Sequence, residues 1–152
     1  NGQHIPLNGQ LSISPIKVPH RDELSDMHAF LICGPKKRLL FLPDHDSWQQ
    51  TLDFHHQPDI RSWLRHLQVD IALLDGTFWS EDELGGRSQE NVPHPPVKQT
   101  LQMLGPRKAD DLEIIFIHLN HTNPLYDESS PAYQEVIENG WQVGVQGQTF
   151  TL

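Results

Sequence analysis

The sequence predicts a mixed α/β fold in a single domain, and three observations support this class. First, apolar runs of strand length occur at residues 11–18, 28–33 and 38–43, and the last two are joined by CGPKKR, a sequence typical of a tight hairpin. Second, the apolar runs that follow alternate with segments of helical periodicity. Third, a chain of 152 residues is long enough for one sizeable core and short for two. We therefore expect a sheet that starts antiparallel and carries helices packed on it.

The elements after residue 43 are predicted from the spacing of their apolar residues. One helix face, capped at its start by Asp59, has the i, i+3, i+4 and i+7 spacing of Ile60, Trp63, Leu64 and Leu67. The run at 69–75 is nearly continuous in apolar residues, which is typical of a strand buried on both faces. The remaining predicted elements are a polar loop at 76–93, a helix from about Pro95 to Leu104, a strand at 112–119, a helix at 129–139 that ends at Gly140, and a final hairpin at 141–152.

The composition of the chain disfavours several classes of function. Eleven basic and twenty acidic residues give a formal charge of −9, which opposes binding to a phosphate backbone, so no nucleic-acid partner is expected. No apolar stretch of 18 residues occurs, and the first ten residues lack the basic start and apolar region of a signal peptide. We therefore expect no membrane partner and a cytoplasmic location. The ten histidines suggest a search for a metal site.

Polar clusters follow three of the predicted strands, at the ends where sheets of this kind collect ligands. Residues 43–46, PDHD, follow one strand, residues 75–78, DGTF, follow the next, and residues 118–123, HLNHTN, follow a third. Carboxylates and imidazoles that converge in this way are the ligands of hard or borderline divalent cations. The sequence therefore indicates a candidate metal site at this edge of the sheet.

Each cluster also has a simpler interpretation. The acids of PDHD, around Asp44, can be the solvated side chains of a Pro-Asp turn. His118 and His121 can be two ligands, or one ligand and a general acid, but Asn120, Thr122 and Asn123 around them can equally form a capping or turn network. The loop at 18–26, which contains a further histidine, reads as a solvated charged loop.

Two other residues are candidates for proton transfer. Asp75 ends an apolar strand, where a carboxylate is costly to bury without a partner, so it is expected to orient a histidine or to touch the metal. His94 lies between prolines in VPHPP, which restrict its backbone, and a restricted histidine suits a proton donor. The alternative for His94 is a rigid loop residue in solvent.

Five motifs in one order carry a specific resemblance to a known family. The chain resembles the pyrroloquinoline quinone biosynthesis protein B (PqqB) family of the metallo-β-lactamase fold through VPHRDE, LPDHDSW, ALLDGTFW, VPHP and FIHLNHTNP. The resemblance implies an αββα sandwich of which this chain corresponds to the C-terminal half. It also implies that Asp44 and His118 bind the metal and that Asp75 and His94 assist proton transfer, as in the tRNA-processing phosphodiesterase branch of the fold. His121 would then support the ligands or contact the substrate.

One departure from the family pattern affects these expectations. The principal metal motif of the fold, HxHxDH, does not occur in this sequence. The chain is therefore expected to be a fragment, although a natural half-domain that pairs with another chain, or a protein that has lost catalysis, would fit as well. The expected partner is the N-terminal half of the fold or another copy of the chain.

The resemblance implies a metal-dependent enzyme with zinc, iron or manganese as its cofactor. The wider fold implies hydrolysis by a metal-activated water, whereas PqqB implies iron-dependent oxygenation in pyrroloquinoline quinone biosynthesis; either would act on a small-molecule or peptide-derived substrate. Histidine and carboxylate ligands suit both zinc and iron. The alternative is a catalytically silent ligand-binding or carrier protein without the full metal site.

Overall fold

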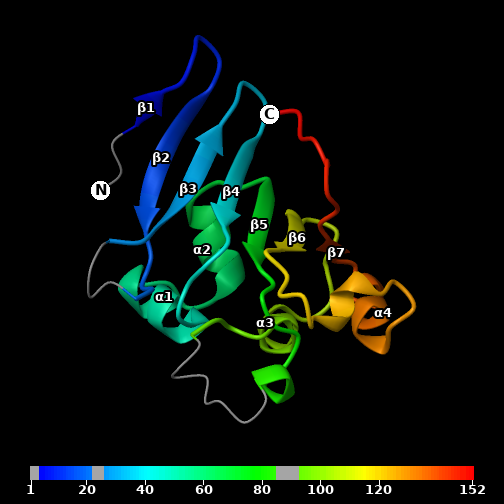
Figure 1. Ribbon diagram of the computed structural model, residues 1–152. Helices are drawn as coiled ribbons and strands as arrows, with labels where there is room; N and C mark the ends of the chain where they lie inside the picture. The colour runs from blue at the N-terminus through cyan, green and yellow to red at the C-terminus, as the bar shows by residue number, and fades with distance from the viewer. Residues whose placement is uncertain (1–3, 22–25, 85–92) are drawn as a thin grey trace.

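The computed structural model describes residues 4–21, 26–84 and 93–152, which form one seven-stranded sheet with helices packed on it (Figure 1). The strands follow the chain in the order β1-β2-β3-β4-β5-β6-β7. Their bounds are β1 Ile5–Pro6, β2 Ser12–Lys17, β3 His28–Cys33, β4 Arg38–Leu42, β5 Ile71–Asp75, β6 Glu113–Ile117 and β7 Gln142–Val143. The helices are α1 Trp48–Phe54, α2 Ile60–His66, α3 Val97–Leu104 and α4 Pro131–Glu138, with 3₁₀ turns η1 Glu81–Leu84 and η3 Pro124–Tyr126.

The sheet changes from antiparallel to parallel at β4. Strands β1 to β4 pair antiparallel, and β3 and β4 form the hairpin predicted from CGPKKR. From β4 to β7 every pairing is parallel, with Leu42 opposite Leu74 and Asp75 opposite Ile117. The carboxyl ends of β4, β5 and β6 therefore meet at one edge of the sheet, which confirms the α/β class and places three polar clusters together.

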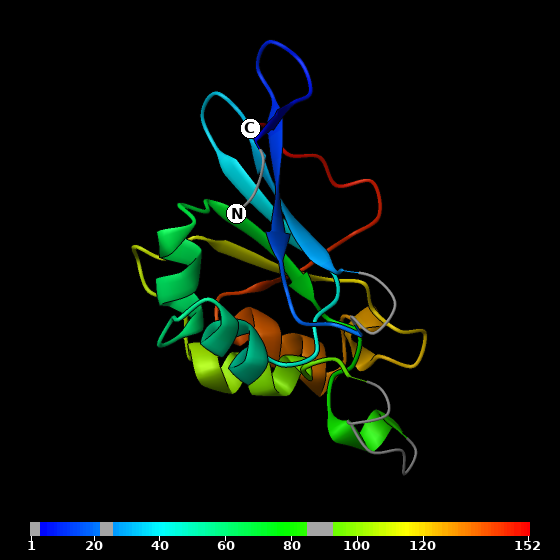
Figure 2. The same cartoon turned by 90° about the vertical axis from the view of Figure 1, so that its left-hand side faces the viewer.

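All four helices pack on one face of the sheet. Figure 2 shows them gathered on one side, where a single apolar cluster joins their buried residues to every second residue of the strands. Trp48, Trp63 and Trp141 are the largest side chains buried there. Three helices have the serine or aspartate N-cap that satisfies a free backbone N–H: Ser47 for α1, the predicted Asp59 for α2, and Ser130 for α4.

The opposite face of the sheet is also apolar but is only partly covered. Leu39, Ile71 and Ile115 are buried there beneath Phe150 and Leu152 of the C-terminal segment, which runs along this side in Figure 2. We call the partly exposed remainder the open face; it comprises Ile32, Phe41, Leu73 and Ile117. A sheet that is apolar on both sides matches the near-continuous apolar runs of β4, β5 and β6.

Two sequence expectations for the elements need correction. The predicted final hairpin at 141–152 is wrong, because Gln142 and Val143 instead form β7, which pairs parallel with β6. A turn does follow at Val145, but its second arm lies over the sheet, where Phe150 and Leu152 bury apolar surface. Helix α1, which has seven residues, was not among the predicted elements.

Candidate metal centre

The structure brings four of the five predicted site residues together at the carboxyl edge of the sheet. Asp44 follows β4, Asp75 ends β5, His118 follows β6, and His94 lies in the segment before α3. Asp44 Oδ1 is 3.8 Å from His94 Nδ1 and 3.6 Å from His118 Nδ1. One ligand atom each from Asp75, His94 and His118 fits within a span of 4.8 Å, and the same holds for His20, Asp44 and His94. Two imidazole-carboxylate triads therefore share His94.

Asp75 and His94 form a hydrogen-bonded pair inside this cluster. Asp75 is 1% exposed, and its Oδ2 lies 2.7 Å from His94 Nδ1. Its Oδ1 accepts from the backbone N–H of Thr77 at 3.0 Å and from the Thr77 hydroxyl at 2.7 Å. The buried carboxylate is thus satisfied, as the sequence analysis required.

The environment of His94 favours its charged form. Burial by itself lowers the pKa of His94, but the hydrogen bond to Asp75 and the charges of Asp75, Asp44 and Asp46 outweigh it, so the pKa is raised above the ordinary histidine value. A histidine that holds a proton beside a buried carboxylate can deliver that proton to a leaving group.

His118 takes an unusual backbone conformation as it leaves β6. Its φ of +60° lies in the left-handed region, which a residue with a side chain rarely adopts without a functional or packing reason. The strand therefore ends two residues earlier than predicted, and the half-exposed ring turns toward Thr77, whose Oγ1 lies 3.0 Å from Nδ1. The adjacent strand end is close-packed, because a Cβ on Gly76 would lie 2.8 Å from Ile117 O.

His20 belongs to the cluster, although the sequence analysis placed it in a solvated loop. That expectation is wrong, because the His20 side chain is only 15% exposed and its ring lies 5.3 Å from the ring of His94. The backbone N–H of Asp46 donates to Pro19 O at 2.9 Å and fastens the loop to the strand end. The only local signal for His20 was its position just after a strand, in VPHRDE.

The donor set fits a divalent cation. His20 Nδ1 and Asp46 Oδ1 are both buried and lie 3.1 Å apart, yet neither makes a well-aligned hydrogen bond to another described residue. The two atoms face each other at ion-pair distance, and both are of the kind that a divalent cation accepts as ligands. Imidazoles and carboxylates at this spacing suit zinc, iron or manganese.

Two other candidate histidines lie outside the cluster. His45 is fully buried, with Nδ1 2.9 Å from Thr51 Oγ1 and its ring edge against Trp48. Burial lowers the pKa of His45 to about 4. The charges of His94 and His20 act in the same direction, and the charge of Asp75 acts against them. His121 is exposed, and its Nδ1 lies 3.1 Å from Asn120 Oδ1. No contact recorded among the described residues joins His121 to the cluster, so its predicted catalytic role stays a prediction.

The turn network considered as the alternative for HLNHTN is present as well. Asn123, which is 3% exposed, donates from Nδ2 to Gly76 O at 2.7 Å and to Thr77 O at 3.2 Å. Asn120 Nδ2 donates to Thr122 Oγ1 at 2.8 Å. The metal and turn interpretations are therefore compatible, because the asparagines hold the loop that presents His118.

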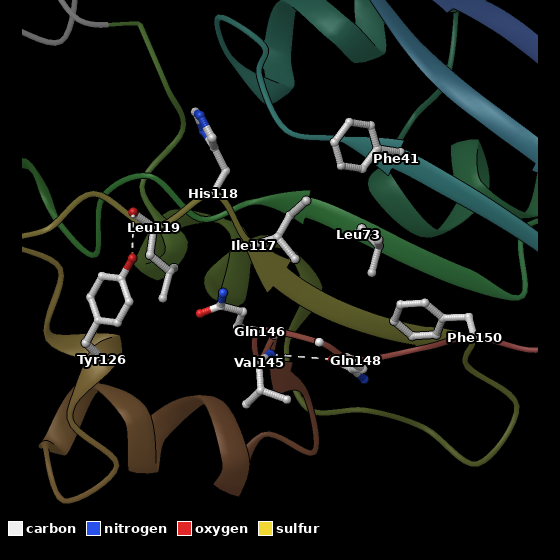
Figure 3. A pocket seen from close by; sticks show the side chains of 12 residues that line it. Phe41, Leu73, Ile117, His118, Leu119, Tyr126, Val145, Gln146, Gln148 and Phe150 are labelled. Carbon is white, nitrogen blue, oxygen red and sulfur yellow. Dashed lines mark hydrogen bonds between the residues drawn. The ribbon is translucent and has the colours of Figure 1, made fainter.

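A cavity of about 420 Å³ opens beside the cluster on the open face of the sheet (Figure 3). Its walls include Phe41, Leu73, Ile117, Tyr126 and Phe150, and His118 also lines it, next to Ile117 and Leu119 in Figure 3. The cavity is thus apolar and reaches a cluster histidine. Among the described residues, no helix has the length and apolar character needed to cross a membrane.

Comparison with known proteins gives the family. The beta-lactamase superfamily domain matches residues 1–119. Coenzyme PQQ synthesis protein B of Methylococcus capsulatus is 31% identical over 104 residues, which are 63% of this chain and 33% of that protein. The protein of the same name from Gluconobacter oxydans is 33% identical over 96 residues, which are 55% of this chain and 30% of that protein. The chain thus spans about a third of the length of these curated relatives.

Solved structures share the fold. A zinc-bound PqqB from Methylobacterium extorquens superposes with a TM-score of 0.69 at 22% identity, covering 99% of this chain and 50% of that one. The metallo-beta-lactamase fold protein YhfI from Bacillus subtilis superposes with a TM-score of 0.56 at 14% identity, covering 93% and 48%. These matches confirm the fold class and the resemblance to PqqB that the five motifs predicted. The chain belongs to the beta-lactamase superfamily, and within it resembles the PqqB proteins.

Proposed function

We propose that this chain supplies half of a divalent-metal centre in a PqqB-like enzyme that acts in pyrroloquinoline quinone biosynthesis. The observation that carries the proposal is the convergence of two histidine-carboxylate triads, which share His94, at one edge of the sheet. The names of the curated relatives support the pathway, and the zinc bound to the Methylobacterium protein supports the cofactor.

The ligand roles combine the family resemblance with the geometry of the cluster. Asp44 and His118 would hold the cation, as the resemblance implies, and His20, which shares a triad with Asp44, would be the further ligand from this chain. A bound divalent cation supplies Lewis-acid polarisation of an oxygen atom, and iron adds redox chemistry. Asp44 lies in the middle of the cluster, because its Oδ1 is within 4 Å of Nδ1 of both His94 and His118.

The pair of Asp75 and His94 would handle the proton. Asp75 Oδ2 accepts from His94 Nδ1, which orients the ring and leaves Nε2 to hold or release a proton. The raised pKa of His94 favours the form of the ring that carries this proton. Both hydrolysis and oxygenation of a small-molecule or peptide-derived substrate need such a group, so the identity of the metal decides between them.

The centre needs further ligands from a partner. The sequence lacks HxHxDH, so we propose that the remaining ligands come from the N-terminal half of the fold or from another copy of the chain. The open face is suited to receive it, because Phe41, Leu73 and Ile117 leave apolar surface beside His118. We also propose a cytoplasmic location, which suits the free thiol of Cys33.

The absence of HxHxDH favours a second candidate function. A catalytically silent carrier would keep the apolar cavity of about 420 Å³ and would not need the full ligand set. For such a protein, Asp44→Ala would change stability modestly and leave its cellular role intact.

The test is element-resolved metal stoichiometry, with zinc, iron and manganese each offered anaerobically to the purified chain. We expect about one metal per chain, lost in Asp44→Ala and in His118→Ala, and retained in His66→Ala, which removes an exposed histidine at the end of α2. Preference for iron over zinc would support oxygenation. Binding that survives both cluster substitutions would contradict the proposed centre, whereas no binding by the wild-type chain would mean that the ligands supplied by the partner are indispensable or that the site is gone.

A further inference from the structure

The hydroxyl of Thr77 lies at the junction of the cluster. Thr77 is 8% exposed, and its Oγ1 is 2.7 Å from Asp75 Oδ1, 3.0 Å from His118 Nδ1 and 3.3 Å from His94 Nδ1. The threonine is the residue whose side chain touches the carboxylate and both histidines.

The number of protons available fixes the directions of these hydrogen bonds. A threonine hydroxyl has one proton to donate and two lone pairs that accept, whereas an ionised carboxylate only accepts. The single proton of Thr77 therefore goes to Asp75, at the shortest of the three distances. The oxygen of Thr77 can then meet His118 Nδ1 only as an acceptor, which requires a proton on that nitrogen.

A second acceptor faces the same ring nitrogen. Asp44 Oδ1 lies 3.6 Å from His118 Nδ1, so a proton on that nitrogen faces a second oxygen that only accepts hydrogen bonds. In a neutral imidazole with Nδ1 protonated, Nε2 keeps the lone pair that can bind a cation. His94 does not compete for the hydroxyl, because its Nδ1 has the closer acceptor Asp75 Oδ2 at 2.7 Å.

The backbone holds Thr77 in place for this contact. The carbonyl of Thr77 accepts from the backbone N–H of Asn120 at 3.0 Å and from Asn123 Nδ2 at 3.2 Å, while its own N–H donates to Asp75. Three hydrogen bonds, two of them from the loop at 118–123, therefore hold the backbone that carries the hydroxyl. The ring of His118, by contrast, extends from a backbone in the left-handed region and is half exposed, so it depends on an external anchor.

We propose that Thr77 is a positioning residue that fixes the orientation and the tautomer of His118, with the proton on Nδ1 and the lone pair on Nε2. The consequence for metal binding rests on the proposed function, but the tautomer itself does not. Hydrogen-bond partners behind a ligating histidine commonly change metal affinity by about 10- to 100-fold.

The experiment compares Thr77→Val, which keeps the shape and loses the hydroxyl, with Thr77→Ser, which keeps the hydroxyl. Long-range ¹H–¹⁵N correlation spectra of the metal-free chain report the tautomer of each histidine, at a pH about two units above the ordinary histidine pKa of about 6.5. The resonances of His118 are assigned by their loss in His118→Gln. Near-UV circular dichroism checks that each variant keeps its tertiary packing.

We expect the wild-type chain and Thr77→Ser to show His118 protonated at Nδ1, and Thr77→Val to show a mixture of tautomers. Zinc affinity should fall about 10- to 100-fold in Thr77→Val and recover in Thr77→Ser. A proton on Nε2 in the wild-type chain, or a tautomer unchanged by Thr77→Val, would overturn the role of Thr77. If the wild-type chain alone binds no zinc, its own residues do not suffice for a metal centre, while the tautomer spectra still decide the role of Thr77.

Discussion

Asn123 should be among the side chains that the site depends on most, although it touches no ligand atom. Its amide donates to Gly76 O at 2.7 Å and to Thr77 O at 3.2 Å, and its Oδ1 accepts from the backbone N–H of Leu125 at 3.0 Å. Asn123→Ala removes all three hydrogen bonds. Thr77 O keeps the N–H of Asn120, but Gly76 O and Leu125 N, both in buried residues, would lose a partner.

The expected loss of stability follows from the two backbone groups that lose their hydrogen-bond partners. Each buried polar group that loses its partner costs about 1–3 kcal/mol, so Asn123→Ala should lower the free energy of unfolding by about 3 kcal/mol. For a domain of this size, that change corresponds to a fall in Tm of about 6–12 °C. The matched control is Asn120→Ala, whose amide bonds to the Thr122 hydroxyl and to His121 Nδ1 in an exposed turn, and whose loss should cost about 0.5 kcal/mol or less.

Urea unfolding followed by tryptophan fluorescence measures both variants, because three tryptophans are buried in the helical core. The zinc affinity of Asn123→Ala is measured in parallel and should fall, since the turn that carries Thr77 is released. A loss of less than about 1 kcal/mol, or a loss equal to that of Asn120→Ala, would refute the view that this amide holds the strand end.

Further predictions concern the frame around the site. Arg61 binds both carboxylate oxygens of Asp111 at 2.8 Å. Arg61→Met should lower the free energy of unfolding in urea by about 3–5 kcal/mol, because it leaves the buried charge of Asp111 unpaired. A loss below about 1 kcal/mol would contradict this. The hydrogen bond from Arg61 lowers the pKa of Asp111, so this stabilisation is present above the unfolded pKa of about 4 and is lost as the pH falls through the lower folded pKa. Acid titrations of the two proteins should therefore converge at low pH, and parallel curves would argue against the pair. Gly76→Ala places a Cβ 2.8 Å from Ile117 O and should lower the free energy of thermal unfolding by about 1–3 kcal/mol. Gly9→Ala is the control, because a Cβ there meets open space and should cost less. Equal effects of the two substitutions would count against close packing at Gly76.

The strand-end rule explains why much of the candidate site could be predicted. Asp44, Asp75 and His118 each follow an apolar run, and the parallel pairing of β4, β5 and β6 brings those ends together whatever the loops do. The fold class depended on the same runs, because residues of β4, β5 and β6 are buried on both faces of the sheet. The local sequence pattern was therefore sufficient to predict those site residues whose position is set by neighbouring parallel strands.

Residues placed by long-range contacts could not be predicted in this way. His20 follows an antiparallel strand, and the hydrogen bond that brings its loop to the site joins Pro19 to Asp46, far along the chain. Thr77 became visible only through distances to three side chains. Helix α1 has only two turns, and its apolar positions Trp48 and Leu52 are too few for periodicity to detect. The prediction of a final hairpin was wrong because the local sequence shows the turn but not the apolar sheet surface that the second arm covers instead.

The order in which the cluster residues occur along the chain has a consequence for how the protein folds. Its ligand candidates run from His20 to His118, so they come together only after β4, β5 and β6 have paired across their intervening helices. Closing such loops is the slow step in folding proteins with many contacts between distant residues. A cation cannot nucleate this chain in the way that closely spaced ligands nucleate a zinc finger. Metal uptake should therefore follow folding rather than start it. In refolding experiments, the rate of metal uptake would measure how fast the last of these parallel strands pairs with the sheet.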